Sequence, residues 1–272
     1  MLVRTLVHLS DLHFGSILAP TLQPLVDAVW ALQPDLTIVS GDFTQRARRL
    51  EFAAATAFVA RLPNPRLCVP GNHDIPLYDV VRRFTTPLAR YLRGITPDLA
   101  PVFIDAEVAV VGINTARSLT FKGGRISAPQ RDATRRAFLR ATLGQARVVV
   151  AHHPFAIPHG LTGVAVVGGA AEAMGGFAAD GVDLVITGHL HLVHVSTGAR
   201  YVAGYDAPVV GAGTATSDRA RGEPNSFMVY RIDATRIHAD VYTWAGDRSS
   251  FICSDTRSFA RQLHAPRGGH SA

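Results

Sequence analysis

The chain has 272 residues, of which 47% are hydrophobic and 18% charged, a composition that favours one large domain with a sizeable core. Its net charge of +6 comes from arginine, because Lys122 is the only lysine, and it favours an anionic partner. Two cysteines exclude a disulfide framework, and no apolar run approaches the roughly eighteen residues of a membrane span. Without a leader-like pattern at the N-terminus, we expect a cytoplasmic protein.

The first part of the chain alternates two hydrophobic periodicities. Short apolar runs typical of buried strands alternate with runs of helical spacing. The runs predict strands over 2–9, 35–40 and 66–69, and helices over 20–32 and 48–62. This alternation indicates an α/β fold with parallel strands inside a layered sheet.

Residues 79–101 differ from their surroundings, because they mix four arginines with Phe84 and Tyr91. The pattern is helical, with breaks at Pro87 and Pro97, and its place just after a polar motif is where a cap or lid would sit. Further strands are predicted within 102–114, over 147–151 and over 183–187, with a helix over 127–143.

From residue 200 the pattern changes to short alternating runs, which indicate antiparallel strands over 201–204, 208–214, 226–232 and 236–244. We expect residues 1–262 to form a single domain and residues 263–272 to form a flexible tail.

Side chains that bind metals follow five of the predicted strands, at the point where each apolar run ends. They are Asp11 and His13, then Asp42, then Asn72, His73 and Asp74, then His152 and His153, then His189 and His191. Parallel strands bring their C-terminal ends to one edge of a sheet. The sequence therefore predicts that these distant positions meet in one pocket.

Residue types and spacing suggest which chemistry this pocket carries. Residues i and i+2 of an extended segment point the same way, so Asp11 with His13, and His189 with His191, can each grip one ion. Carboxylate and imidazole ligands together suit Mn, Fe, Zn or Ni better than Ca or Mg. Seven candidate ligands fit two divalent ions that share Asp42, and such pairs promote displacement at phosphorus. The candidates are Asp11, His13, Asp42, Asn72, His152 (favoured over His153), His189 and His191.

In order and spacing, these motifs resemble those of the calcineurin-like metallophosphoesterases. The resemblance covers residues 11–191 and implies a four-layer αββα sandwich, with mixed sheets flanked by helices and a dinuclear metal centre. By resemblance, the first metal is bound by Asp11, His13 and His191, the second by Asn72, His152 and His189, and Asp42 bridges them. A metal-bridging hydroxide would then attack phosphorus.

The resemblance also implies catalytic roles for two neighbouring residues. His73 is similar to the family's residue that protonates the leaving oxygen or stabilises the phosphoryl group, and Asp74 would orient its imidazole. Where the family often has an acidic residue three positions after the bridging Asp, this chain has Gln45, which puts a substrate contact there in doubt. Candidate substrate contacts are Gln45, Arg82, Arg83, His153 and His194.

The substrate is less defined than the chemistry. Within the superfamily the chain is most similar to bacterial class III cyclic nucleotide phosphodiesterases, which implies hydrolysis of a cyclic nucleotide or a related small phosphodiester. A pyrophosphatase acting on UDP-diacylglucosamine is an alternative, with the 79–101 segment as an apolar lid and the basic surface in peripheral contact with a membrane. A nuclease is a further alternative, although a nucleic acid partner is not favoured.

A non-catalytic, metal-bearing scaffold is the hypothesis from another class. Scaffolds of this fold typically lose the Asn-His pair or a ligand, whereas His73 and all seven ligand positions are present here. The sequence therefore favours an enzyme acting on a small anionic phosphoester, and it leaves the oligomeric state open.

Overall fold

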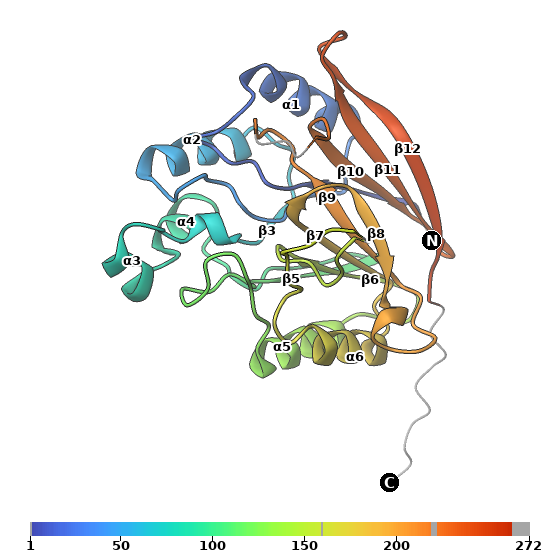
Figure 1. Ribbon diagram of the computed structural model, residues 1–272. Helices are drawn as coiled ribbons and strands as arrows, with labels where there is room; N and C mark the ends of the chain where they lie inside the picture. Colours follow the sequence, from blue (N-terminus) through green and yellow to red (C-terminus); the bar gives the residue numbers. More distant parts are fainter. Residues whose placement is uncertain (1, 159, 219–221, 263–272) are drawn as a thin grey trace.

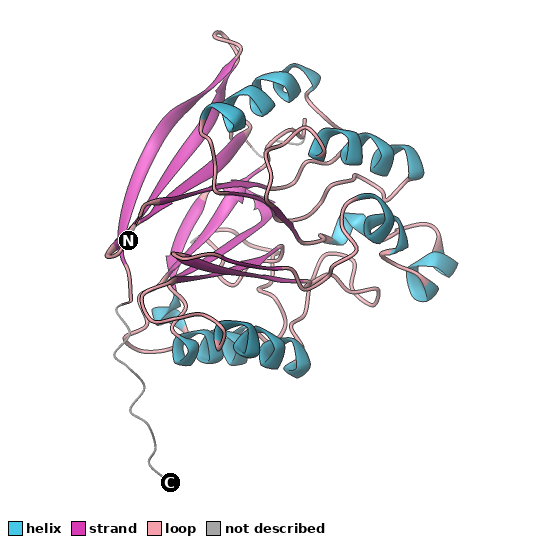
Figure 2. Ribbon diagram, turned by 180° about the vertical axis from the view of Figure 1, so that it is seen from behind, coloured by secondary structure: helices cyan, strands magenta, loops and turns pink. Residues whose placement is uncertain are grey.

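Two six-stranded mixed sheets lie face to face at the centre of the computed structural model, which describes residues 2–158, 160–218 and 222–262. Helices cover the outer face of each sheet, so the layers run helix, sheet, sheet, helix (Figures 1 and 2). This is the αββα arrangement that the motifs imply. No helix within the described residues is both long and apolar enough to cross a membrane.

The first sheet has the strand order β12-β11-β10-β1-β2-β3. Its parallel strands are β1 (Arg4–Leu9), β2 (Leu36–Val39) and β3 (Arg66–Cys68), and its antiparallel strands are β10 (Ser226–Ile232), β11 (Arg236–Ala245) and β12 (Ser250–Ala260). The connections between the parallel strands contain α1 (Leu22–Ala31) and α2 (Arg49–Val59).

The second sheet has the order β4-β5-β6-β7-β9-β8. Its parallel strands are β5 (Val108–Ile113), β6 (Ala146–Ala151), β7 (Leu184–His191) and β9 (Pro208–Gly213), and the antiparallel edges are β4 (Val102–Ile104) and β8 (His194–Thr197). Helices α5 (Ala128–Phe138) and α6 (Ala170–Asp180) lie together below this sheet in Figure 1.

Three apolar layers hold the sandwich together. The middle layer lies between the sheets, where Ile38 of β2 and Val150 of β6 are fully buried. The outer layers pack α1 and α2 on the first sheet and α5 and α6 on the second. Since the central strands are covered on both faces, they are continuous apolar runs, which is why the sequence reveals them.

Several predicted elements differ from the structure. The five strands that precede the polar motifs belong to two sheets: β1, β2 and β3 to the first, and β6 and β7 to the second. Residues 201–204 form turns after the 3-10 helix Gly198–Arg200 instead of a strand. Strand β12 was not predicted, because most of its side chains are exposed and carry no apolar alternation. The predicted tail, 263–272, lies outside the described residues.

The 79–101 segment, where the sequence predicts a lid, divides into two parts. It contains α3 (Val80–Thr85) and α4 (Ala89–Gly94). The Tyr91 side chain of α4 is fully buried and packs against Phe43, so α4 belongs to the core. Only α3 stands out at the rim, on the left of Figure 1.

Candidate metal centre

The ends of four strands from both sheets, β1, β2, β6 and β7, converge on two clusters of ligand atoms. Asp11, His13, Asp42 and His191 form one cluster, and Asp42, His152 and His189 form the other, with the ligand atoms of each cluster within 4.8 Å of one another. Asp42 belongs to both clusters, and the side chains are buried except for that of His189, which is partly buried. The pocket expected from the sequence is therefore formed across the two sheets.

Asn72 completes the second cluster. Its Oδ1 lies 3.2 Å from His152 Nε2 and 3.0 Å from His189 Nδ1. Its Nδ2 donates a hydrogen bond of 3.2 Å to the backbone carbonyl of Phe121, which turns Oδ1 toward the histidines. All seven predicted ligands thus lie together, in the two groups that the family resemblance implies.

The backbone at these residues is unusual. Five of the seven have positive φ, a conformation that L residues other than glycine adopt rarely and that recurs at functional sites. They are Asp11 (φ 55°), His13 (50°), Asp42 (52°), His189 (72°) and His191 (59°). The residues of the i and i+2 pairs therefore have left-handed backbone dihedrals and not, as the spacing predicts, those of extended chain.

The glycines beside the ligands are required by close packing. A Cβ at Gly71 would lie 2.1 Å from Asp42 Oδ1, and a Cβ at Gly188 would lie 1.8 Å from Ser10 Oγ. Both distances are far below van der Waals contact. The glycines thus let the strand ends approach closely enough for their side chains to share an ion.

The donor set fits a pair of divalent cations. The Nε2 atoms of His13 and His191 are 2.9 Å apart, and the buried Oδ1 of Asp11 has no hydrogen-bond partner among the described residues. His152 places Nδ1 2.7 Å from the carbonyl of Ser40, so Nδ1 carries the hydrogen and Nε2 faces the site. Divalent ions bound here would be coordinated by these nitrogen and oxygen atoms, which face one another.

Electrostatics keep the Asp42 carboxylate ionised. Burial opposes ionisation of Asp42, but the charges of His152 and His73 bring the pKa of its carboxyl below the usual range. Burial likewise opposes the charge on His152, yet Asp42 raises its pKa to about 9. Burial lowers the pKa of His189 to about 4, which favours the neutral form that binds metals.

His73 lies at the edge of the clusters and is only partly buried. Its Nδ1 is 2.8 Å from the carbonyl of Gln45, and its backbone N–H donates 2.8 Å to Asp42 Oδ1. Asp74 does not orient this imidazole, contrary to the expectation. Its carboxylate accepts from the backbone N–H groups of Thr44 (3.0 Å) and Gly71 (2.9 Å), and so fixes the loop that carries His73.

An open cleft of about 220 Å³ leads to His73. It is lined by Gln45, Arg46, Asn72, His73, Ile75, Leu77, Arg83, Phe121 and Lys122. Of the predicted substrate contacts, Gln45 and Arg83 thus lie at the cleft. Arg83 is buried, however, and its guanidinium donates to the carbonyls of Pro76, Ser118 and Thr120, so it builds the wall.

The other three predicted substrate contacts lie elsewhere. Arg82 lines a separate groove and pairs with Asp79 at 2.9 Å. His153 is buried behind the ligand histidines, where its Nδ1 lies 2.7 Å from Thr115 Oγ1. His194 is buried on β8 and is absent from the cleft lining. Adjacency in sequence to a motif did not bring these side chains to the cleft, because neighbouring residues point in different directions.

A buried hydrogen-bond chain behind Asp11 was missed. His8 Nε2 lies 2.7 Å from Ser40 Oγ, which donates to Ser10 Oγ at 2.9 Å, which donates to Asp11 Oδ2 at 2.5 Å. Because each hydroxyl donates toward Asp11, His8 must donate from Nε2. The chain occupies Oδ2 and leaves Oδ1 for metal, and the only sequence signal was a histidine inside an apolar strand.

Comparisons with known proteins agree with this geometry. The sequence profile described as calcineurin-like phosphoesterase matches residues 4–193. A search of curated protein sequences found no match.

Solved structures share the fold at low sequence identity. Purple acid phosphatase PPD1 from yellow lupin has a TM-score of 0.73 at 10% identity, over 96% of this chain and 54% of that one, so the chain spans about half of the lupin protein's length. PhoD has a TM-score of 0.72 at 8% identity, over 97% and 70%. A dimetal phosphatase from Danio rerio has a TM-score of 0.68 at 13% identity, over 95% and 99%.

The profile match extends over more than half of the chain, and it includes every residue of the two ligand clusters. The fold, the paired clusters and this match together show that the chain belongs to the calcineurin-like phosphoesterase family.

Proposed function

We propose that the protein is a dinuclear-metal phosphodiesterase that hydrolyses a cyclic nucleotide or a related small phosphodiester. The observation that carries this proposal is the position of His73 at the mouth of the cleft, beside the carboxylate common to both clusters. A proton donor at this place is needed most when the leaving group is a poor one, as in an alkyl phosphodiester.

The chain's own residues support the steps of such a reaction. Two bound divalent ions would supply Lewis acidity and a water molecule of lowered pKa. Nδ1 of His73 donates to the carbonyl of Gln45, so the protonated imidazole would give its Nε2 proton to the departing oxygen. Arg46 and Lys122 on the cleft wall supply positive charge for a phosphoester anion.

The cleft's size and charge favour a small substrate. A cavity of about 220 Å³ whose lining includes Arg46, Arg83 and Lys122 suits one phosphodiester with its immediate substituents. Loss of the ligands or of the Asn-His pair would favour a scaffold, but both are present here. We therefore propose catalysis ahead of a structural role.

A second candidate is a pyrophosphatase acting on UDP-diacylglucosamine or a similar lipid-linked substrate. The observation that favours it is the apolar part of the cleft lining, because Leu77 and the 65% exposed Phe121 would suit acyl chains. We expect Mn, Fe, Zn or Ni as the metal, from the mixture of oxygen and imidazole donors. A cytoplasmic location is proposed from the free thiols of Cys68 and Cys253.

A substrate panel on one metal-loaded sample tests the proposal. The panel holds bis(p-nitrophenyl) phosphate, p-nitrophenyl phosphate, 3′,5′-cyclic nucleotides, UDP-diacylglucosamine and single-stranded DNA. We expect turnover of the model diester above the monoester, and turnover of a cyclic nucleotide. Preference for the lipid-linked substrate or for DNA would overturn the substrate assignment, and no turnover with any of the four metals would overturn catalysis itself.

His73→Ala tests the carrying observation within the same panel. The variant should keep both metal ions and lose about a hundredfold or more in turnover of cyclic nucleotides, whose leaving group needs a proton. The loss should be smaller for bis(p-nitrophenyl) phosphate, because nitrophenolate leaves without one. Equal losses on both substrates would contradict the role of His73 as an acid.

A further inference from the structure

An apolar surface stands at the rim of the cleft. It consists of Val80, Val81 and Phe84 of α3 with Leu119 and Phe121 of the loop after β5, and we name it the apolar rim. Val81 is 72% exposed and Leu119 is 85% exposed, and the other three are also exposed. Large apolar side chains gathered on a projecting helix and loop mark an interaction site more often than scattered ones do.

Arg83 makes the rim one continuous surface. Its guanidinium donates 2.7 Å to the carbonyl of Ser118, and it also lies over the ring of Phe121, 4.6 Å from the centroid. The helix and the loop are therefore fixed to each other.

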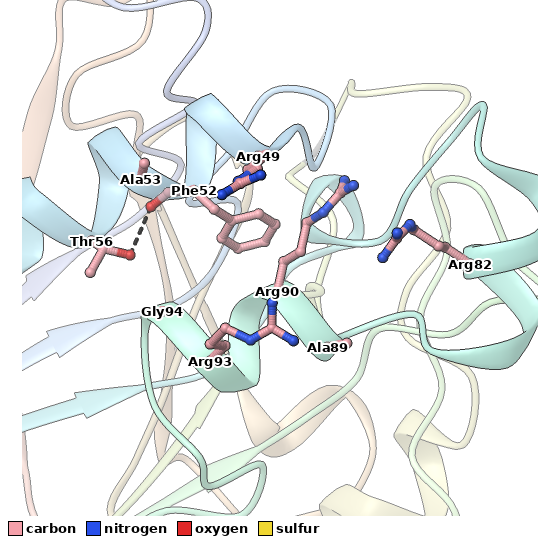
Figure 3. Close-up of a pocket in the computed structure, with 9 residues that line it drawn as sticks. All are labelled: Arg49, Phe52, Ala53, Thr56, Arg82, Ala89, Arg90, Arg93 and Gly94. Carbon is pink, nitrogen blue, oxygen red and sulfur yellow. Dashed lines mark hydrogen bonds between the residues drawn. The ribbon is translucent and has the colours of Figure 1, made fainter.

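A basic groove lies beside the rim, between α2 and α4. Its volume is about 430 Å³, and it is lined by Arg49, Phe52, Ala53, Thr56, Arg82, Ala89, Arg90, Arg93 and Gly94. Figure 3 shows the side chains of Arg49, Arg90 and Arg93 near Phe52, with that of Arg82 farther to the right. Within the described residues, Arg49 and Arg93 form no ion pair, whereas Arg82 pairs with Asp79. Four arginines and one carboxylate give the groove a net positive charge, which favours binding of an anion.

Helical geometry relates the groove to the rim. At 3.6 residues per turn, Val80, Val81 and Phe84 fall on one outer arc of α3. Arg82, on one side of that arc, lines the groove, and Arg83, on the other side, holds the loop. The order across the surface is therefore basic groove, apolar rim and catalytic cleft.

We propose that this surface binds an anionic phospholipid bilayer, with the apolar rim inserted among the acyl chains and the groove arginines receiving lipid phosphates. Apolar side chains flanked by arginine are the pattern of helices that lie in the membrane interface. Because Phe121 also lines the cleft, docking would turn the cleft mouth toward the lipid. The inference does not depend on which phosphoester is hydrolysed.

Two other occupants fit less well. A second copy of the chain, related by twofold symmetry, would bring basic groove close to basic groove. Single-stranded nucleic acid would use the arginines and the rings of Phe84 and Phe121, but it would leave the aliphatic side chains of Val80, Val81 and Leu119 in water. Both occupants are outcomes of the test.

Vesicle flotation of the full chain tests the proposal. We expect binding to vesicles of phosphatidylglycerol mixed with phosphatidylcholine, little binding to phosphatidylcholine alone, and weaker binding at high salt. The double variant Arg49→Gln/Arg93→Gln should lower the partition coefficient about 25-fold, since each basic side chain near an anionic surface contributes about fivefold. Val81→Ser/Phe84→Ser should lower it about tenfold or more.

Matched controls lie on the far side of the second sheet. Leu139→Ser/Leu143→Ser removes two exposed apolar side chains, and Arg135→Gln/Arg136→Gln removes two exposed arginines of α5. Both controls should bind vesicles as the unaltered chain does, and all variants should keep their turnover of bis(p-nitrophenyl) phosphate in solution and their melting temperature.

Four results would overturn the proposal. They are no flotation, equal flotation with neutral vesicles, equal losses in the control variants, and a dimer by light scattering that Val81→Ser/Phe84→Ser abolishes while vesicles stay unbound. Binding of a fluorescent oligonucleotide without vesicle binding would point to nucleic acid instead. Since flotation needs no turnover, failure of the proposed enzymatic activity would leave this result readable.

Discussion

Asp42 stands between the two ligand clusters, and its backbone has positive φ. No other carboxylate within the described residues belongs to both clusters. Its Oδ1 also accepts the backbone N–H of His73, at 2.8 Å. Asp42 would therefore hold both ions, and it also fixes the backbone of the proposed acid, so we expect it to be the most sensitive residue of the site.

Asp42→Asn should therefore lose metal. The amide keeps the size of the side chain but supplies neither the charge nor two bridging oxygens, so we expect fewer than two bound ions per chain by elemental analysis after gel filtration. Asp218→Asn, a change at an exposed carboxylate bonded to Ser16, should retain both ions. Two ions in the Asp42 variant would show that the bridging assignment is wrong.

His8 makes the stability of the metal-free protein depend on pH. Burial lowers its folded-state pKa to about 3, against an ordinary value of about 6.5. Below pH 6.5 the unfolded chain therefore binds a proton at His8 that the folded chain does not bind. The free energy of unfolding decreases as the pH falls from 6.5 toward 3. Between pH 6.5 and pH 5 the His8 contribution to the loss should be about 2 kcal/mol.

His8→Gln separates this contribution from that of other histidines. Glutamine keeps a donor for Ser40 and does not titrate. Urea denaturation with chelator present should give the variant a shallower fall in unfolding free energy between pH 7 and pH 5. Identical slopes for both proteins would show that His8 titrates in the folded chain as it does in the unfolded chain.

At the scale of elements, the sequence predicts features that depend on neighbouring residues, and it misses features that depend on contacts between distant segments. An apolar run that ends in a polar cluster is a local signal, so the strand ends and the residues brought together there could be predicted. The carbonyl of Gln45 on His73 and the carbonyl of Phe121 on Asn72 could not, because backbone groups leave no trace in residue type. Strand β12 was missed because pairing with β11, rather than apolar alternation, makes it a strand.

The loop after β5 is held by such a contact between distant segments, which a substitution can test. Its position depends on Arg83, whose guanidinium donates to the carbonyls of Ser118 and Thr120 from a buried position in α3. Arg83→Met keeps much of the side-chain volume and removes the donors. We expect a loss of about 3 kcal/mol in unfolding free energy and faster amide hydrogen exchange over 118–124.

Arg82→Met is the matched control for this change. Arg82 is the neighbouring, exposed arginine of α3, and its pair with Asp79 contributes little in water. Exchange over 118–124 should be unaltered in this control. Equal effects in both variants would mean that α3 as a whole, and not the Arg83 guanidinium, holds the loop.

For the whole molecule, the edge of the sandwich opposite the metal clusters is held by ion pairs between the two sheets. Arg4 of β1 donates from Nε to Asp105, in the turn between β4 and β5, at 2.6 Å. Arg261 follows β12, and Asp183 precedes β7. The Nε of Arg261 lies 3.4 Å from Oδ1 of Asp183, and both side chains are almost fully buried. Each pair joins a strand of the first sheet to one of the second, so they hold the sandwich without touching the ligands.

Arg261→Met should accordingly separate global stability from metal binding. The variant removes one member of a buried pair from beside the Asp183 carboxylate, and such changes cost about 3–5 kcal/mol. We expect that loss by urea denaturation in the metal-free state, while the folded variant still binds two ions with unaltered affinity by calorimetry. Arg257→Met, which breaks the exposed pair with Asp255, should change the unfolding free energy by less than about 0.5 kcal/mol. A parallel fall in metal affinity for Arg261→Met would contradict this separation. It would mean that this edge sets the relative position of the sheets, and that the ligands after β1, β2 and β3 meet those of β6 and β7 only while the Arg261–Asp183 pair is intact.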